Sequence, residues 1–193
     1  MLESLHAWLL ANGLWYALLA VFAFVLIDAC LFPALPDLFA VLAFLVEPGL
    51  WWGLAILGTV CVGEILGNTL LYSLVKRKRL PDFIERTMNK WVGFLFVKDE
   101  KALLLNRFAP MIPYSGAFIA TCGWSFRRSL MFIIAGGLAK YSVLLGIAFA
   151  LNSTLDSGMA ALATIAAVVI ILVASLASAH VLKRRMKAQE GLR

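Results

Sequence analysis

Long apolar runs, separated by short polar segments, dominate the pattern along this chain. A membrane-spanning helix needs about 20 predominantly apolar residues. Runs of this kind cover residues 7–27, 50–75, 129–151 and 158–182, and none of them contains more than one acidic or basic charge. The pattern therefore predicts an all-α polytopic membrane protein in which these four segments span the bilayer.

Two other apolar segments, 33–46 and 102–124, are too short or too interrupted to span. Each carries a Pro-x-x-Pro sequence: Pro33 and Pro36 in the first segment, Pro110 and Pro113 in the second. Proline breaks a helix interior because it lacks an N–H donor and clashes with an earlier carbonyl. Short, interrupted apolar segments are typical of re-entrant hairpins, which enter the bilayer and return to the same side.

The positions of the basic residues predict an orientation. Cytoplasmic flanks of membrane helices are enriched in Lys and Arg, and such residues occur at 76–79, 127–128 and 183–185. These positions place both termini in the cytoplasm, with the first hairpin entering from outside and the second from inside. The segment 81–97 becomes a cytoplasmic link at the membrane surface.

The two halves of this layout resemble each other. Each half has a Pro-x-x-Pro hairpin followed by a long helix with one charge near its middle, and the two halves enter from opposite faces. We therefore predict an inverted repeat, the plan of many secondary transporters with sites at the midplane. Residues 1–193 form a single transmembrane domain, in which 151–182 holds the final helix and 183–193 is a basic cytoplasmic tail.

Composition narrows the function classes. The chain is 63% hydrophobic and 15% charged. In soluble domains, about half of the residues are hydrophobic and about a quarter are charged. The net charge of +6 is explained by the helix flanks, and no nucleic-acid motif accompanies it. The three cysteines and two histidines show no metal-ligand spacing. Enzyme signatures are absent, so we expect no catalytic residues, no cofactor and no metal.

Five charged residues fall within the apolar segments: Asp28, Asp37, Glu64, Arg107 and Lys140. Charges at membrane depth are costly and by default mark a pathway or site. The alternative is ion pairing that only holds the halves together. Glu64 and Lys140 occupy similar places and would pair with each other, and Asp28 would reach water from a helix end.

Small and polar residues surround Glu64 at helical spacing. Gly63 and Gly67 form a Gly-x-x-x-Gly pair, which permits close helix packing. Asn68 and Tyr72 follow Glu64 at one-turn spacing on a similar face and complete the candidate transport site.

These motifs together resemble the DedA family, also called the SNARE-associated or VTT superfamily, over about residues 25–150. Asp28 followed by Phe32-Pro33-Ala34-Leu35-Pro36-Asp37 is similar to the family's acid, proline-rich turn, acid pattern. Gly63-x-x-x-Gly67-Asn68-x-x-x-Tyr72 is similar to its Gly-x-x-x-Gly-Asp-x-x-x-Tyr pattern. Arg107-Phe108-Ala109-Pro110 is similar to its Arg-Phe-x-Pro signature. Two positions differ: Asn68 replaces the usual aspartate, and Pro113 stands where many bacterial members have a second arginine.

The resemblance implies movement of lipids between leaflets, as a flippase or scramblase of the cell membrane. The substrate would carry a phosphate, as in a polyprenyl phosphate or a phospholipid, and protons are a candidate coupling ion. Arg107 would hold the phosphate through forked contacts, while Asp37, Asp28 and Glu64 would exchange protons or release the head group. Two alternatives use the same sequence: a proton- or ion-coupled transporter of a small solute or drug, and a non-transporting membrane assembly factor.

Overall fold

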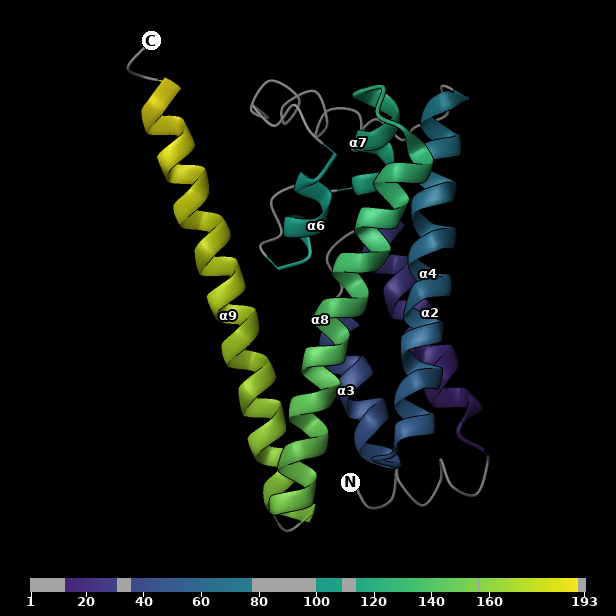
Figure 1. Cartoon of the computed structure of the whole chain (residues 1–193), viewed down its shortest axis with the longest axis vertical. Coiled ribbons are helices and arrows are strands. Elements are labelled where there is room, and N and C mark those ends of the chain that lie inside the picture. The colour runs from purple at the N-terminus through teal and green to yellow at the C-terminus, as the bar shows by residue number, and fades with distance from the viewer. Residues whose placement is uncertain (1–12, 31–35, 78–99, 109–113, 156, 191–193) are drawn as a thin grey trace.

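A computed structural model describes residues 13–30, 36–77, 100–108, 114–155 and 157–190. Every regular element in these ranges is a helix (Figure 1). Two of them, α4 (Leu50–Lys76) and α8 (Phe126–Thr154), are long and apolar enough to cross a membrane. At about 1.5 Å per residue, each exceeds the roughly 30 Å of a bilayer core.

The first half of the fold is built from two short helices and α4. α2 (Trp15–Cys30) and α4 run in the same direction, since Val25 lies against Gly63 and Ala29 lies against Gly67. α3 (Pro36–Val46) runs back along them toward the end where α4 begins (Figure 1). The rings of Phe24 and Phe39 stack between α2 and α3, with centroids 3.4 Å apart.

Two further short helices pack on the long helices in the second half of the chain. α6 (Ala102–Asn106) runs alongside α8, because the Leu104 carbonyl and Arg107 lie against Gly136. α7 (Ser115–Thr121) runs back toward the end where α8 begins (Figure 1). α7 packs on α4, where the backbone of Asn68 lies so close that a Cβ atom on Gly116 would be 2.3 Å from the Asn68 carbonyl oxygen.

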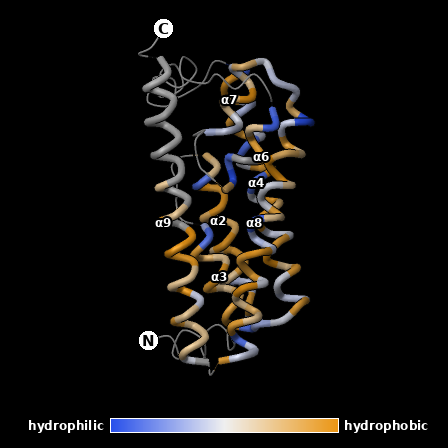
Figure 2. The backbone as a smooth tube through the Cα atoms, turned by 60° about the vertical axis from the view of Figure 1, so that its left-hand side comes forward, coloured by the Kyte–Doolittle hydropathy of each residue, from blue (hydrophilic) through white to orange (hydrophobic). Residues whose placement is uncertain are grey.

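Two apolar clusters hold these helices together. The larger joins α2, α3, α4, α8 and α9 (Ser157–Glu190) around Val25, Val41, Ile56 and Leu144. The smaller joins α4, α6, α7 and α8 around Phe118 and its neighbours. Where the backbone is coloured, Figure 2 shows many hydrophobic positions along the helices, with hydrophilic positions at mid-height as well as at the ends.

The outward faces of the long helices are also apolar. Leu66 and Leu70 on α4, Met131 and Phe149 on α8, and Ile170 on α9 are all exposed. Contiguous exposed apolar surface of this kind marks contact with a membrane or another protein.

The structure corrects the sequence prediction for the first helix. A spanning helix was expected over 7–27, followed by a hairpin over 33–46. The described helix instead begins at Trp15, ends at Cys30 and has 16 residues, which is too short to cross. It packs on α3, which begins at Pro36. The final helix continues to Glu190, through most of the predicted tail.

Other expectations fall on residues outside the described ranges. These are the positions of the termini themselves, the link at 81–97, and the conformation around Pro33, Pro110 and Pro113. Pro36 is described and is the first residue of α3, a position that suits proline because the first N–H of a helix has no partner within it.

Because α2 and α4 approach closely at some glycines and not at others, adding a methyl group should lower stability at only some of these positions. A Cβ atom on Gly67 would lie 2.5 Å from the Ala29 Cβ, whereas one on Gly58 would meet nothing within 4 Å. Overpacking costs about 1–3 kcal/mol. We expect Gly67→Ala to lower the thermal unfolding midpoint of the detergent-purified protein and Gly58→Ala to leave it unchanged or raise it. Equal midpoints for the two variants would contradict this packing.

Candidate functional site

A buried ion pair joins α3 to α8. Asp37 lies in the first turn of α3, and its Oδ2 is 2.6 Å from Nζ of Lys140 on α8. The Asp37 side chain is 4% exposed and that of Lys140 is 22% exposed. Helix N-termini attract negative charge, so the first turn of α3 also stabilises this carboxylate.

A second buried ion pair joins the end of α6 to α4. Arg107 directly follows α6, and its Nη2 donates to Oε2 of Glu64 at 2.5 Å. Asn68, one turn along α4, donates from Nδ2 to the same carboxylate oxygen at 3.0 Å and to the Glu64 carbonyl at 2.8 Å. The Glu64 carboxylate is therefore held from two directions within an apolar bundle.

The two ion pairs are reciprocal. The acid on a short helix of the first half binds the long helix of the second half, and the arginine of the second half binds the long helix of the first half. The alternative in which Glu64 and Lys140 pair with each other is therefore not observed. Each is instead paired with a charge next to a proline-containing stretch, Glu64 with Arg107 and Lys140 with Asp37.

Asp28 belongs to the same group of charges. It lies in the last turn of α2, close to where Ala29 meets Gly67 near the middle of α4, so its end of the helix is inside the bundle rather than at its surface. Its charge acts electrostatically on both Glu64 and Arg107. Among the described residues, the group thus brings three carboxylates together with two cations.

The described contacts leave spare hydrogen-bonding capacity in both pairs. Within the described residues, Oδ1 of Asp37 and Nε of Arg107 are buried and have no hydrogen-bond partner. Buried polar atoms are usually satisfied, and an exception calls for an explanation such as a bound water, ion or ligand. Asp37 Oδ1 is a hydrogen-bond acceptor and Arg107 Nε is a donor, so the site can bind both a donor group and an acceptor group.

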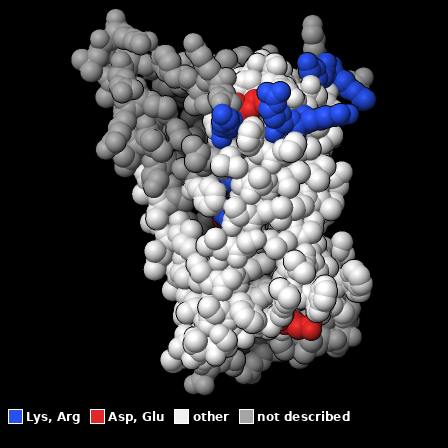
Figure 3. Space-filling model, viewed as in Figure 1, with Lys and Arg blue, Asp and Glu red and all other residues white. Residues whose placement is uncertain are grey.

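The charged group is not fully enclosed. The side chains of Arg107 and Lys140 retain 14% and 22% exposure. On the face drawn in Figure 3, basic residues gather at the end where α4 finishes and α8 starts, and a small patch of charged atoms shows in a recess at mid-height. The bundle therefore presents some charge to its surroundings between its two ends.

The remaining predicted site residues lie elsewhere or have a packing role. The ring of Tyr72 contacts Phe126, with centroids 4.5 Å apart, and Nζ of Lys76 is 5.7 Å from the Tyr72 ring. Tyr72 thus lies toward the basic end and away from the ion pairs. The packing role predicted for Gly63 and Gly67 is confirmed, since both face α2.

Sequence reasoning missed Tyr141. Its side chain is buried, and Nζ of Lys140 is 5.7 Å from its ring centroid. A signal was available, because Tyr141 follows Glu64 by 77 residues, the same offset that relates Pro33 to Pro110. Asn106 was also missed; its Nδ2 donates to the Ser115 hydroxyl at 3.4 Å and links α6 to α7.

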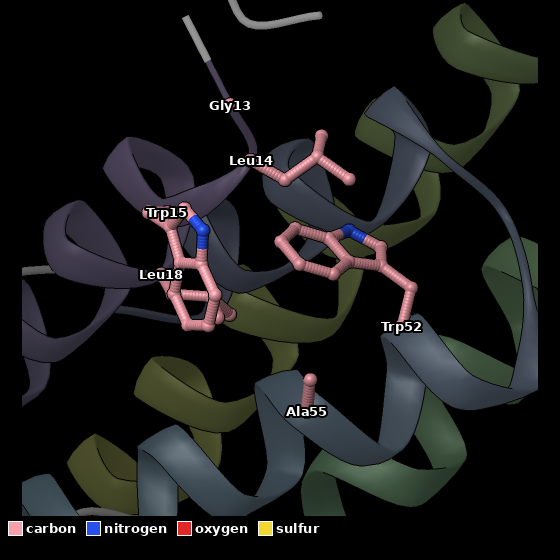
Figure 4. A pocket seen from close by; sticks show the side chains of 6 residues that line it. All are labelled: Gly13, Leu14, Trp15, Leu18, Trp52 and Ala55. Carbon is pink, nitrogen blue, oxygen red and sulfur yellow. The ribbon is translucent and has the colours of Figure 1, made fainter.

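A separate apolar pocket lies at the end of the bundle where α2 and α4 begin. Trp15 and Trp52 flank it, with Leu14 and Ala55 between them (Figure 4). The Trp52 indole donates to the Ala43 carbonyl at 2.8 Å, which fixes the ring against α3. The described lining residues carry no charge, so the pocket is distinct from the ion-paired group.

Comparison with protein-family models, with curated proteins and with solved structures gives no match to this chain. The similarity to DedA proteins accordingly rests on the quoted motifs alone. What the site can do has to be argued from its own chemistry. It holds a guanidinium and an ammonium group, each bound to one carboxylate, inside an apolar bundle.

The pairing predicts a specific pattern of thermal stability. Removing one partner of a buried pair leaves an uncompensated charge and costs about 3–5 kcal/mol. We expect Arg107→Gln and Glu64→Gln each to lower the unfolding midpoint by about 10 °C, and the double variant to lose less than the sum. Asp37→Asn and Lys140→Gln should behave in the same way.

The mismatched combination provides the control. Glu64→Gln with Lys140→Gln removes one partner from each pair, so the two losses should add more nearly than in either matched double variant. A coupling between Glu64 and Lys140 larger than that of the matched pairs would contradict the reciprocal arrangement.

Proposed function

We propose that this chain is an integral membrane protein that moves a phosphate-bearing lipid between leaflets, as a flippase or scramblase, and is not an enzyme. The observation that carries the proposal is the group of buried, reciprocal ion pairs halfway along an apolar bundle. Charged residues inside a membrane are costly, face a protein interior or cavity, and mark pathways. A structural role alone would not require Arg107 and Lys140 to stay partly exposed at mid-height.

The arrangement of short helices supports a membrane-embedded inverted repeat. α2 with α3, and α6 with α7, would form two re-entrant hairpins that enter from opposite faces and meet near the midplane. Irregular backbone at membrane depth is tolerated where it is buried in protein or lines a wet cavity. The breaks between the paired arms would lie at this depth, next to Asp37 and Arg107.

The site chemistry favours a lipid phosphate. A guanidinium binds phosphate through forked, charge-assisted contacts, and Lys140 offers a second cation. The acyl chains would remain along the exposed apolar faces of α4 and α8 while the head group crosses beside the charged group. The partial exposure of both cations supports a groove open to lipid over the closed aqueous cavity that a small-solute transporter needs.

The decisive experiment is lipid translocation in liposomes. The protein is reconstituted with a fluorescent phospholipid in both leaflets, and a membrane-impermeant quencher is added. We expect signal loss beyond the outer-leaflet share with wild type and with Glu47→Gln, a matched control at an exposed position. Arg107→Gln and Asp37→Asn should reduce the extra loss to the level of protein-free liposomes, at equal incorporation.

Other outcomes separate the alternatives. Equal extra loss with all variants would remove Arg107 and Asp37 from the mechanism. No extra loss with any protein would call for the same assay with a fluorescent polyprenyl phosphate. Failure with that lipid as well would overturn the lipid proposal in favour of a solute transporter or a non-transporting assembly factor.

The charge distribution also supports an orientation in the cell membrane. On the face drawn in Figure 3, basic residues gather where α4 ends and α8 begins. Glu47 lies between the end of α3 and the start of α4, so it is at the opposite end of α4. Basic flanks face the cytoplasm. The end of α9 lies on this basic side (Figure 1), which agrees with a cytoplasmic C-terminus.

Cysteine labelling tests this orientation. In a variant lacking the three native cysteines, Glu47→Cys and Arg127→Cys place single thiols at exposed positions near opposite ends. We expect a membrane-impermeant maleimide to label position 47 in intact cells and position 127 only after permeabilisation. The reverse pattern would invert the orientation and the faces from which the two hairpins enter.

A further inference from the structure

The contacts of Arg107 describe an anion site that already holds an anion from the protein itself. Nη2 of Arg107 binds the Glu64 carboxylate, while its Nε is buried without a hydrogen-bond partner among the described residues. A forked anion engages two N–H groups of a guanidinium at once. The Glu64 carboxylate therefore uses only some of the N–H donors of Arg107 that a phosphate could use.

Asn68 holds the Glu64 carboxylate, the internal anion, in position. Its amide donates to the same Glu64 oxygen that binds Arg107 and also to the Glu64 carbonyl one turn back. Asn68 is itself 1% exposed, and its backbone lies against Gly116 at the start of α7. The amide is thereby fixed, and it holds the Glu64 carboxylate toward Arg107.

We propose that Glu64 is a competing internal anion, held in place by Asn68, which a lipid phosphate must displace from Arg107. The inference rests on the proposed function and adds how the site is regulated. A ligand that binds only the fraction of protein with a free guanidinium has its apparent affinity lowered by that fraction. Displacement in turn lets the phosphate leave again, because Glu64 returns as the head group departs.

The proposal makes Glu64 and Asn68 act with opposite sign to Arg107. Losing Arg107 removes the site, so binding falls. Losing the Glu64 charge removes the competitor, so binding becomes tighter even though a buried ion pair has been broken. Losing the Asn68 amide loosens the competitor and gives an intermediate gain. A cluster that merely stabilised the fold would show losses at all three positions.

Binding is measured by isothermal titration calorimetry on the full chain in an uncharged detergent. The probes are dihexanoyl phosphatidic acid and inorganic phosphate, so that a lipid head group and a free phosphate are distinguished. We expect Glu64→Gln to bind the lipid at least about tenfold more tightly than wild type, Asn68→Leu to lie between them, and Arg107→Gln to lose binding. Glu47→Gln makes the same chemical change at an exposed position and should match wild type.

The outcomes separate this inference from the function it rests on. If wild type binds, Arg107→Gln does not and Glu64→Gln binds equally or more weakly, then the phosphate site stands and the competing anion is overturned. If Glu64→Gln fails to fold, Asn68→Leu decides, and unchanged or weaker binding overturns the proposal. Absence of binding of both probes even in Glu64→Gln overturns the phosphate site and with it the competing anion, while the translocation assay decides on the function itself. Tighter binding of both probes shows that the site recognises phosphate in general. Tighter binding of the lipid alone shows that the acyl chains also contribute to recognition.

Discussion

The cost of burying charge in an apolar bundle is the constraint on which this structure depends. Within the described residues, two acids and two cations meet that cost by pairing between halves, Asp37 with Lys140 and Glu64 with Arg107. Each pair needs a short helix to reach the middle of the bundle, and this explains why the chain is interrupted next to the charges. A continuous spanning helix has no terminus in the middle of the bundle. α3 starts there at Pro36, so its first turn, with Asp37, lies next to Lys140.

Close packing supplies the geometry that the ion pairs require. Gly63 and Gly67 let α2 approach α4, Gly136 lets the end of α6 approach α8, and Gly116 lets α7 rest on the backbone of Asn68. Adding a methyl group at Gly67, Gly116 or Gly136 would place it within 3 Å of a neighbouring atom, a distance that forces the helices apart. Charge pairing and glycine packing thus act on the same contacts, so a shift of α7 would also disturb the amide that holds Glu64.

Much of the fold was predictable from the sequence, because apolar length and proline positions report helices directly. The segments 50–75 and 129–151 correspond closely to α4 and α8. The partners were not predictable, since pairing depends on which helices adjoin and in which direction α2 runs. The similar places of Glu64 and Lys140 in the two halves left a direct pair open, whereas the structure pairs them with Arg107 and Asp37. Tyr141 escaped notice because a tyrosine in an apolar run is usually a packing residue or an interfacial anchor.

The reciprocal pairing also has a consequence for how the protein is made. The ribosome delivers Asp37 and Glu64 to the membrane before Arg107 and Lys140 have been synthesised. During that interval the first half contains two acids whose native partners do not yet exist, and an unpaired carboxylate at membrane depth is strongly unfavourable. In the proposed membrane setting, the first half alone would hold its acids near water, as protonated groups or against another protein, until the second half is made. Lys140 is the last of these charges to be synthesised, so both ion pairs exist only after α8 has been made.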